Sequence, residues 1–397
     1  MLAYSSQHID NSAIQHHAKK WQKHGLLSSQ TYEAIKAKYP HSLYSPNLFV
    51  RLGLFIFTAI GLLAGGSYFI FITAGFDSAT EVGFGVRLLI TGLMMFGVLE
   101  GLIKQKDIFR AGSDDALLYS AIGCMVSGLT LLFYQSGRSD ENELLLYCLI
   151  AIPFLVLGTI RYMDTLSAAG FFICVFLIIF ILISKLGEIS KLIMPFLVMI
   201  LSALSYFTAS KYRAHEKFRF WEMPLMILEI LSLVLFYMAG NYFIVRTLSE
   251  ELFRMQLTEG EDIPLAFFFY AYTAIIPMAY VFYGLKNKNR VLLQTGLVLV
   301  AAAVLTFKYY FSLGHHEITL TISGVIMILI AWLSIRFLKT PKYGITFEED
   351  SDEKILDKFD AEALIIAQSF SSTHAPAQDG VEMGGGNFGG GGASSDF

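Results

Sequence analysis

Charged residues are scarce in this chain, and their scarcity excludes an ordinary soluble protein. Asp, Glu, Lys and Arg make up 16% of the 397 residues, whereas soluble globular proteins carry about 25%. Hydrophobic residues account for 55% of the sequence, which is typical of a protein embedded in a membrane. The formal net charge of −4 is small. We therefore expect a lipid bilayer around the chain and no nucleic-acid partner.

Cysteine and recognisable catalytic motifs are also scarce or absent. The three cysteines, Cys124, Cys148 and Cys174, lie far apart inside apolar runs, and we expect buried thiols rather than a disulfide or metal site. The sequence contains no Gly-rich phosphate loop, no Cys/His metal spacing, no nucleophile motif and no HEXXH pattern. We expect no cofactor and no metal, and an enzyme is not favoured. The first 25 residues lack an apolar core, which predicts that there is no cleavable signal peptide.

Long apolar runs dominate what is present. Each run is about 20 residues long, which is the length that a helix needs to cross a bilayer. The connections between them are mostly short and carry Pro, Gly or charge. We therefore predict an all-α fold, a polytopic transmembrane helical bundle of about ten spans: 49–73, 84–103, 115–134, 142–160, 166–184, 190–209, 223–246, 264–284, 290–312 and 317–338.

The residues before the first span predict a small helical hairpin. Residues 1–47 are polar, and caps at 10–12 and 28–29 begin two helices that end at Gly25 and Pro40. Such a hairpin either docks a partner or packs on the bundle as a cap, and both interpretations stay open.

The residues after the last span differ in composition from the rest. Residues 339–370 form an acidic segment, with eight acidic residues in 348–362 and the apolar spacing of a short amphipathic helix. Residues 371–397 form a Gly-rich tail that cannot bury enough surface to fold alone, so we expect it to be disordered. The hairpin and this tail are candidate contacts for a cytoplasmic protein partner.

Lysine and arginine in the short loops predict the orientation. One set of loops holds eleven of them, and the alternate set holds five, together with eight acidic residues. Because basic loops stay in the cytoplasm, this bias predicts that both termini are cytoplasmic. An even number of spans agrees with that orientation.

Matching motifs predict an internal repeat. Gly66-Ser67-Tyr68-Phe69-Ile70 corresponds to Gly240-Asn241-Tyr242-Phe243-Ile244, and other matches also lie 174 to 176 residues apart. We infer two parallel copies of four spans, 48–162 and 211–338, joined by a two-span linker at 163–210. Chance matching among aromatic-rich segments is the alternative.

Glu229 is the most prominent charge inside an apolar run. It lies about six residues, roughly 9 Å, from the predicted cytoplasmic end of its span. A charge at a helix centre costs roughly 2.5–3.5 kcal/mol on insertion scales, so it faces protein or water. It is either a proton- or cation-binding carboxylate or a structural carboxyl bonded to a neighbouring helix.

Glu100, at the inner end of its span, is expected to snorkel to the interface.

Three further polar residues are candidate intramembrane sites. Asn241 lies in the same apolar run as Glu229. Arg87, near the outer start of its span, pairs with a carboxylate or reaches the interface. Lys308 lies near the outer end of its span, close to His315 and His316. For that cluster a pH-sensitive loop is favoured over a metal site.

The opening of the chain resembles bacterial membrane proteins that carry domain of unknown function 2157. The resemblance covers about the first quarter of the chain and rests on Trp21, Gly25-Leu26-Leu27-Ser28, Gln30, Tyr39 and Gly53. It implies a polytopic membrane protein of bacterial origin, here of the inner membrane, and it supplies no activity and no catalytic residue.

These patterns favour a transporter-like protein for a small solute or ion, with Glu229 as the coupling site. The alternative is a non-transporting scaffold or sensor that holds cytoplasmic partners through its termini. A water-lined cavity that reaches Glu229 favours transport, and a Glu229 bonded to another helix in a tightly packed interior favours a scaffold.

Overall fold

A computed structural model describes residues 2–74, 81–133, 140–251 and 262–310, together with the single positions Ile328, Trp332 and Arg336. At 74, 140, 188–192, 251 and 307–310 the description is limited to the backbone. The described residues form helices joined by short connections, apart from one isolated β-bridge between Tyr44 and Ile108. The all-α prediction is therefore confirmed for this part of the chain.

The helices follow one another in the order that the sequence predicts. Their bounds are α1 Ser6–Lys23, α2 Ser29–Lys38, α3 Leu48–Ala74, α4 Glu81–Lys106, α5 Ser113–Leu132, α6 Asp140–Tyr162, α7 Thr165–Ser184, α8 Glu188–Arg213, the 3-10 helix η1 Glu216–Trp221, α9 Glu222–Gly240, α10 Tyr242–Glu251, α11 Ala266–Lys286 and α12 Arg290–Tyr310.

Eight of the described helices are long and apolar enough to cross a membrane, which supports a membrane-spanning helical bundle. They are α3 to α9 and α11, and they correspond to the first eight predicted spans. The apolar residues 290–306 of α12 lie where the ninth span is predicted. The predicted span 317–338, the acidic segment 339–370 and the tail 371–397 lie outside the described residues, apart from the three single positions.

The predicted span 223–246 is wrong in its last six residues, because the helix breaks at Asn241. α9 ends at Gly240, Asn241 is extended with φ −70° and ψ 124°, and α10 begins at Tyr242. The Asn241 side chain accepts a hydrogen bond from the Ile244 N–H at 3.3 Å, as an N-cap does. The Tyr242 N–H donates to Thr273 Oγ1 at 3.0 Å instead of to a carbonyl of α9. Side-chain partners thus replace the bonds that would continue the helix.

The predicted hairpin is present, with one shifted boundary. Ser28 caps α2 by accepting from the Thr31 N–H at 3.1 Å, and Gly25, with φ +72°, follows the end of α1. α1 begins at Ser6 rather than at 10–12. The chain before α1 is held on the bundle, because the Ala3 N–H donates to the Arg161 carbonyl at 3.0 Å.

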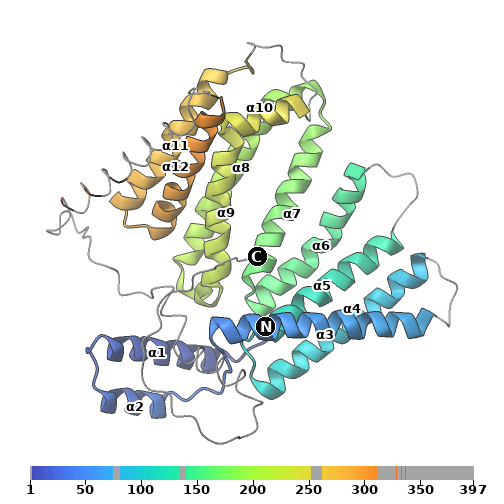
Figure 1. Ribbon diagram of the computed structural model, residues 1–397, viewed down its shortest axis with the longest axis vertical. Coiled ribbons are helices and arrows are strands. Elements are labelled where there is room, and N and C mark those ends of the chain that lie inside the picture. The colour runs from blue at the N-terminus through green and yellow to red at the C-terminus, as the bar shows by residue number, and fades with distance from the viewer. Residues whose placement is uncertain are drawn as a thin grey trace, which may run out of the picture.

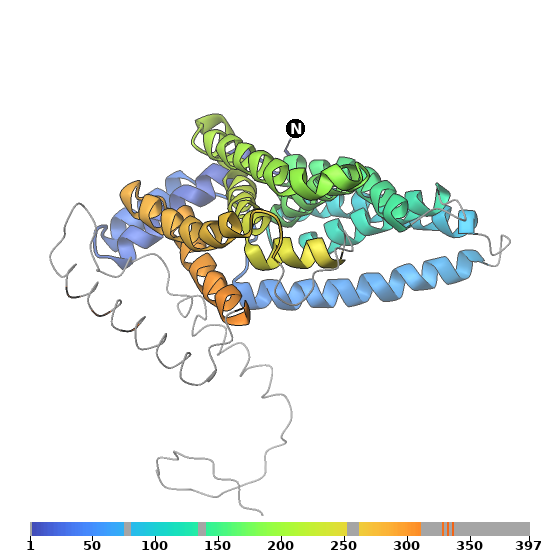
Figure 2. The same cartoon turned by 90° about the horizontal axis from the view of Figure 1, so that it is seen from above.

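The long helices form two groups that meet along α7 (Figure 1). α3 to α6 lie on one side, α8, α9, α11 and α12 lie on the other, and α7 packs against both α6 and α9. We call the end of the bundle at which α1 and α2 lie the hairpin end, and the opposite end the far end. Figure 2 shows α3 running along the edge of the bundle.

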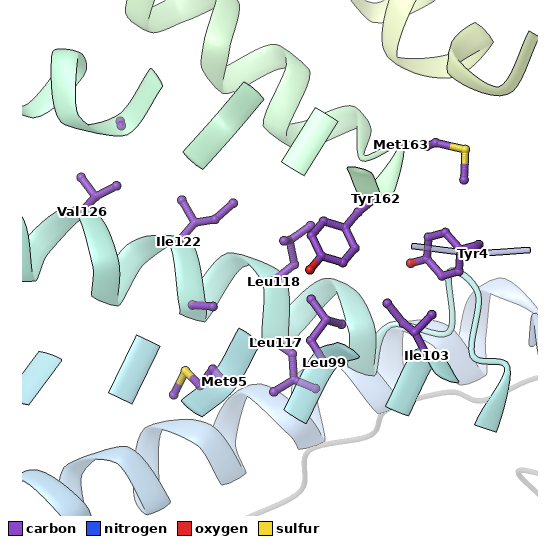
Figure 3. Close-up of a cluster of buried hydrophobic side chains, with 12 residues drawn as sticks. Tyr4, Met95, Leu99, Ile103, Leu117, Leu118, Ile122, Val126, Tyr162 and Met163 are labelled. Atoms are coloured by element: carbon purple, nitrogen blue, oxygen red, sulfur yellow. The ribbon is translucent and has the colours of Figure 1, made fainter. Parts of the chain in front are cut away.

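The largest apolar cluster lies at the hairpin end. Leu99 and Ile103 of α4 meet Leu117 and Leu118 of α5, and further buried side chains continue the cluster along α5. Figure 3 shows the rings of Tyr4 and Tyr162 at one end of this row of aliphatic side chains. The N-terminal segment is therefore part of the core, and it lies next to the polar residues described below.

Candidate functional site

Glu229 is fully buried and is paired with a residue of the neighbouring helix. Its Oε1 accepts from Arg213 Nε at 2.9 Å, which links α9 to the last residue of α8. The Glu229 side chain is 0% exposed, and the Arg213 side chain is 24% exposed. Oε2 makes no hydrogen bond of good geometry within the described residues, although Ser210 lies beside the carboxylate. Next along α9, Ser232 donates to Ser205 Oγ on α8 at 3.0 Å.

Asn241 lies at the centre of a second buried polar cluster, at the far end of α9. Its amide nitrogen donates to the Tyr237 hydroxyl at 2.8 Å and to Thr306 Oγ1 at 3.1 Å, so it joins α9 to α12. Asn241 is 2% exposed, and Thr273, which accepts from the Tyr242 N–H, is 0% exposed. These hydrogen bonds link α9, α11 and α12 to one another at the far end.

Arg87 lies apart from both clusters. Arg87 is buried in α4, and its Nη1 donates to the Thr73 carbonyl near the end of α3 at 3.3 Å. Its Nε has no hydrogen-bond partner in the described part of the chain. Within the described residues, the hydrogen-bond partner of Arg87 is thus a backbone carbonyl. Lys308 lies on α12 with its side chain outside the description, and His315 and His316 lie outside the described residues.

A cavity of about 370 Å³ lies at the hairpin end. Its walls come from the N-terminal segment and from α3, α4, α5, α6, α7 and α9, so it lies between the two groups of helices. Its polar lining includes three carboxylates, two guanidinium groups and three phenols: Asp114, Asp115, Asp164, Arg51, Arg110, Tyr4, Tyr119 and Tyr162. Ile227 of α9 lines the cavity, and Glu229 does not. Two residues apart on a helix point about 200° apart, which explains the difference.

The carboxylates of the cavity are fixed by the chain around them. Asp114 Oδ1 accepts from the N–H groups of Ala111 and Gly112 at 2.9 and 3.0 Å, just before α5. Asp115 pairs with Arg51 of α3, whose Nε donates to Oδ2 at 3.1 Å. Aspartates fit here because the first turn of a helix has unpaired N–H donors and favours negative charge.

Asp164 is held at the start of α7 in the same way. Its Oδ2 accepts from the Ser167 N–H at 2.6 Å, and its Oδ1 accepts from the Tyr119 hydroxyl at 2.8 Å. Tyr4 closes the cavity from the N-terminal segment, and its hydroxyl donates to Asp114 Oδ2 at 3.4 Å. Burial, and then the neighbouring carboxylates, raise the pKa of Tyr4 well above its usual range, so the phenol stays a donor. The result is a rigid cavity with acceptors fixed on several sides.

Glu100 forms a further ion pair beside the cavity, so the expectation that it snorkels is wrong. Its two carboxylate oxygens accept from Arg161 Nε and Nη2 at 2.7 and 2.9 Å, and Tyr162 donates to Oε1 at 2.8 Å. This bidentate pair ties α4 to α6. Arg161 was available as a partner because it ends a span on the same side.

Sequence reasoning missed the cavity. Charged residues are common next to the connections between spans, and this is where Asp114, Asp115 and Asp164 lie. Their positions alone do not distinguish them from ordinary loop charges. One signal was present in the sequence. All three lie at span starts on the side of the hairpin, and Arg51 lies at another span start on that side. The sequence candidates Glu229, Asn241 and Arg87 fall in three separate places, and the structure does not bring them together.

Comparison of the chain with protein-family models, with curated proteins and with solved structures finds no match.

Proposed function

We propose that this chain is a transporter-like membrane protein for a small solute or ion, and that the cavity at the hairpin end is its binding site. The cavity itself carries the proposal. Its volume of about 370 Å³ falls in the range of small-molecule sites, roughly 300–1,000 Å³. It lies where both groups of helices contribute walls, so a bound solute would contact both.

The lining defines the chemistry that such a site would recognise. Carboxylates that already accept helix N–H groups keep further lone pairs, which suit a cationic group or the hydroxyls of a solute. Arg110, which lines the same cavity and stacks on Phe109, supplies a positive charge on another wall. Fixed groups of this kind lower the ordering cost of binding.

The proposed topology has ten spans, with both termini in the cytoplasm of a bacterial inner membrane. Under this topology the hairpin end, and therefore the cavity, faces the cytoplasm. The 4+2+4 repeat is part of the same proposal. In its support, α4 packs mainly on α5 and α11 mainly on α12, while α3 packs more on α5 than on α4 and α9 more on α12 than on α11. The resemblance to proteins with domain of unknown function 2157 is consistent with such a protein.

A scaffold or sensor is the second candidate, and the position of Glu229 favours it. Glu229 is bonded to α8 and does not line the cavity, which is the arrangement expected of a structural carboxyl. We therefore assign solute binding to the cavity and a structural role to Glu229. A sensor would use the same cavity, since Tyr4 connects it to the N-terminal segment.

A binding screen tests the cavity directly. Purified protein is heated with a panel of monovalent and divalent cations, amines and amino acids, and a bound solute raises the unfolding temperature. Saturation at 100 times Kd stabilises by about 2.7 kcal/mol. Ala169 lines the cavity, so Ala169→Phe fills it and should abolish the shift. Ala301→Phe, at an exposed position of α12, is the matched control and should keep it.

A shift that survives in Ala169→Phe would remove the cavity as the binding site. A panel without any stabilising solute would leave the cavity as a structural gap, and the transport proposal would lose its support.

A further inference from the structure

The helical hairpin carries a net positive charge, and several of its lysines are exposed. Residues 1–47 hold five lysines and two acidic residues, a net charge of +3 with His neutral. Lys19 on α1 and Lys36 and Lys38 on α2 are exposed. α2 has no buried residue, and its main helix partner among the described helices is α1. Figure 1 shows α2 on the side of α1 that is turned away from the bundle.

The same hairpin also exposes large apolar side chains. Trp21 is 49% exposed and Leu26 is 73% exposed, and Ile14 lies two turns before Trp21 on α1. Their setting differs from that of the exposed side chains of the long helices, because α1 and α2 are too polar to lie in a bilayer. A hairpin that is both basic and partly apolar suits a partner that is acidic and amphipathic.

The chain contains a segment of that kind. Residues 348–362 hold eight acidic residues and two lysines, a net charge of −6, and Ile355, Leu356 and Phe359 provide an apolar side. Nine residues, 339–347, separate it from the predicted end of the last span at 338. Extended, they reach about 30 Å. The segment is therefore held close to the membrane surface from which the hairpin projects, and a short tether gives an effective concentration of about millimolar.

We propose that the acidic segment 348–362 docks on the positively charged hairpin of the same chain, with its apolar side against Trp21 and Leu26. The inference rests on the proposed placement of both termini on one side of the membrane, and it is independent of transport. Docking in this way covers the exposed aromatic ring of Trp21 and offsets the positive charge of the hairpin.

Zero-length cross-linking of the full-length protein in nanodiscs tests this contact. A carbodiimide joins a lysine to a carboxylate only when the two groups touch, and mass spectrometry identifies the pair. We expect cross-links from Lys19, Lys36 or Lys38 to residues 348–362. Lys36→Glu with Lys38→Glu should lower the yield of cross-links from Lys19, which keeps its amine, at least about fivefold, in line with the loss of exposed ion pairs. Adding Asp352→Lys and Asp357→Lys should restore coupling with the roles reversed.

The matched control is Lys286→Glu with Lys288→Glu, two exposed lysines at the hairpin end that lie outside the hairpin. This variant should leave the yield unchanged. Salt at 1 M shortens the screening length to about 3 Å, and it should lower the yield in the wild type.

Absence of the cross-links in the wild type overturns the proposal, as does a yield that charge reversal does not change or that the reciprocal substitutions do not restore. In a mixture of isotope-labelled and unlabelled protein, cross-links mainly between labelled and unlabelled chains would show that the segment docks on a second copy. That result would also overturn the proposal. A separate experiment tests the topology. Single cysteines are placed at 20 and 395, and intact cells are treated with a membrane-impermeant thiol reagent. Labelling at one terminus alone would place the termini on opposite sides.

Discussion

The buried pair of Glu229 and Arg213 gives the sharpest stability prediction. We expect Arg213→Gln to destabilise the protein by about 3–4 kcal/mol, because it leaves a buried carboxylate without its charge partner. Glu229→Gln should cost less, about 1–2 kcal/mol, since it removes a hydrogen bond to a charged group. Arg213 is 24% exposed and can reach solvent when its partner is removed, whereas Glu229 is 0% exposed and cannot. The difference in cost between the two single substitutions therefore follows from the difference in exposure between the two side chains.

The double variant decides the interpretation. A pair of amides has no buried charge, so the double variant should be within about 1 kcal/mol of the wild type. The coupling energy in the resulting cycle should be at least about 3 kcal/mol, the upper end of the range for residues in contact. The assay is reversible unfolding in mixed micelles of increasing SDS content, followed by tryptophan fluorescence.

Two results would refute this reasoning. If Arg213→Gln changes stability by less than about 0.5 kcal/mol, as a surface substitution does, the pair does not hold α8 to α9. If the double variant regains stability but loses the binding or flux of an identified solute, Glu229 has a functional role beyond its structural one.

Three further substitutions test the packing around the site. Gly240→Ala should cost about 1–3 kcal/mol, since its Cβ would overlap two neighbouring side chains. Its control is Gly61→Ala, where the Cβ meets open space, which should stay within about 0.5 kcal/mol of the wild type in the same SDS titration. Asn241→Leu should cost about 1–3 kcal/mol by leaving buried hydroxyls without a partner, and a neutral result in thermal unfolding would contradict the network. Gly112→Ala should cost at least about 1 kcal/mol, because φ is +94° and its Cβ would meet a backbone carbonyl of α3; an unchanged melting temperature would argue against this geometry.

The parts of the fold that local signals control could be predicted from the sequence. Ser28 caps its helix and Gly25 follows the end of α1, because capping and positive φ depend on neighbouring residues alone. The apolar runs gave the long helices, since span length depends on bilayer thickness. Asn241 shows the limit of this reasoning. Its apolar neighbours predict a continuous helix, and the break depends on partners from α11 and α12.

The candidate site was harder to predict because it depends on contacts distant in sequence. Arg51 and Asp115 are separated by 64 residues, and Glu100 and Arg161 by 61. No periodicity relates such pairs, and a charge at the start of a span has the same appearance whether it faces water or a cavity. A charge deep within a span, such as Glu229, is therefore recognisable from the sequence, whereas the aspartates at the span starts are not.

The most direct test of the central claim is solute counterflow in proteoliposomes, with the solute that the thermal screen identifies. Our account predicts that wild-type protein accumulates labelled solute against unlabelled solute inside, that Ala301→Phe does the same, and that Ala169→Phe does not. Binding in the screen without any counterflow in the wild type would contradict a transporter and leave the cavity as the site of a sensor.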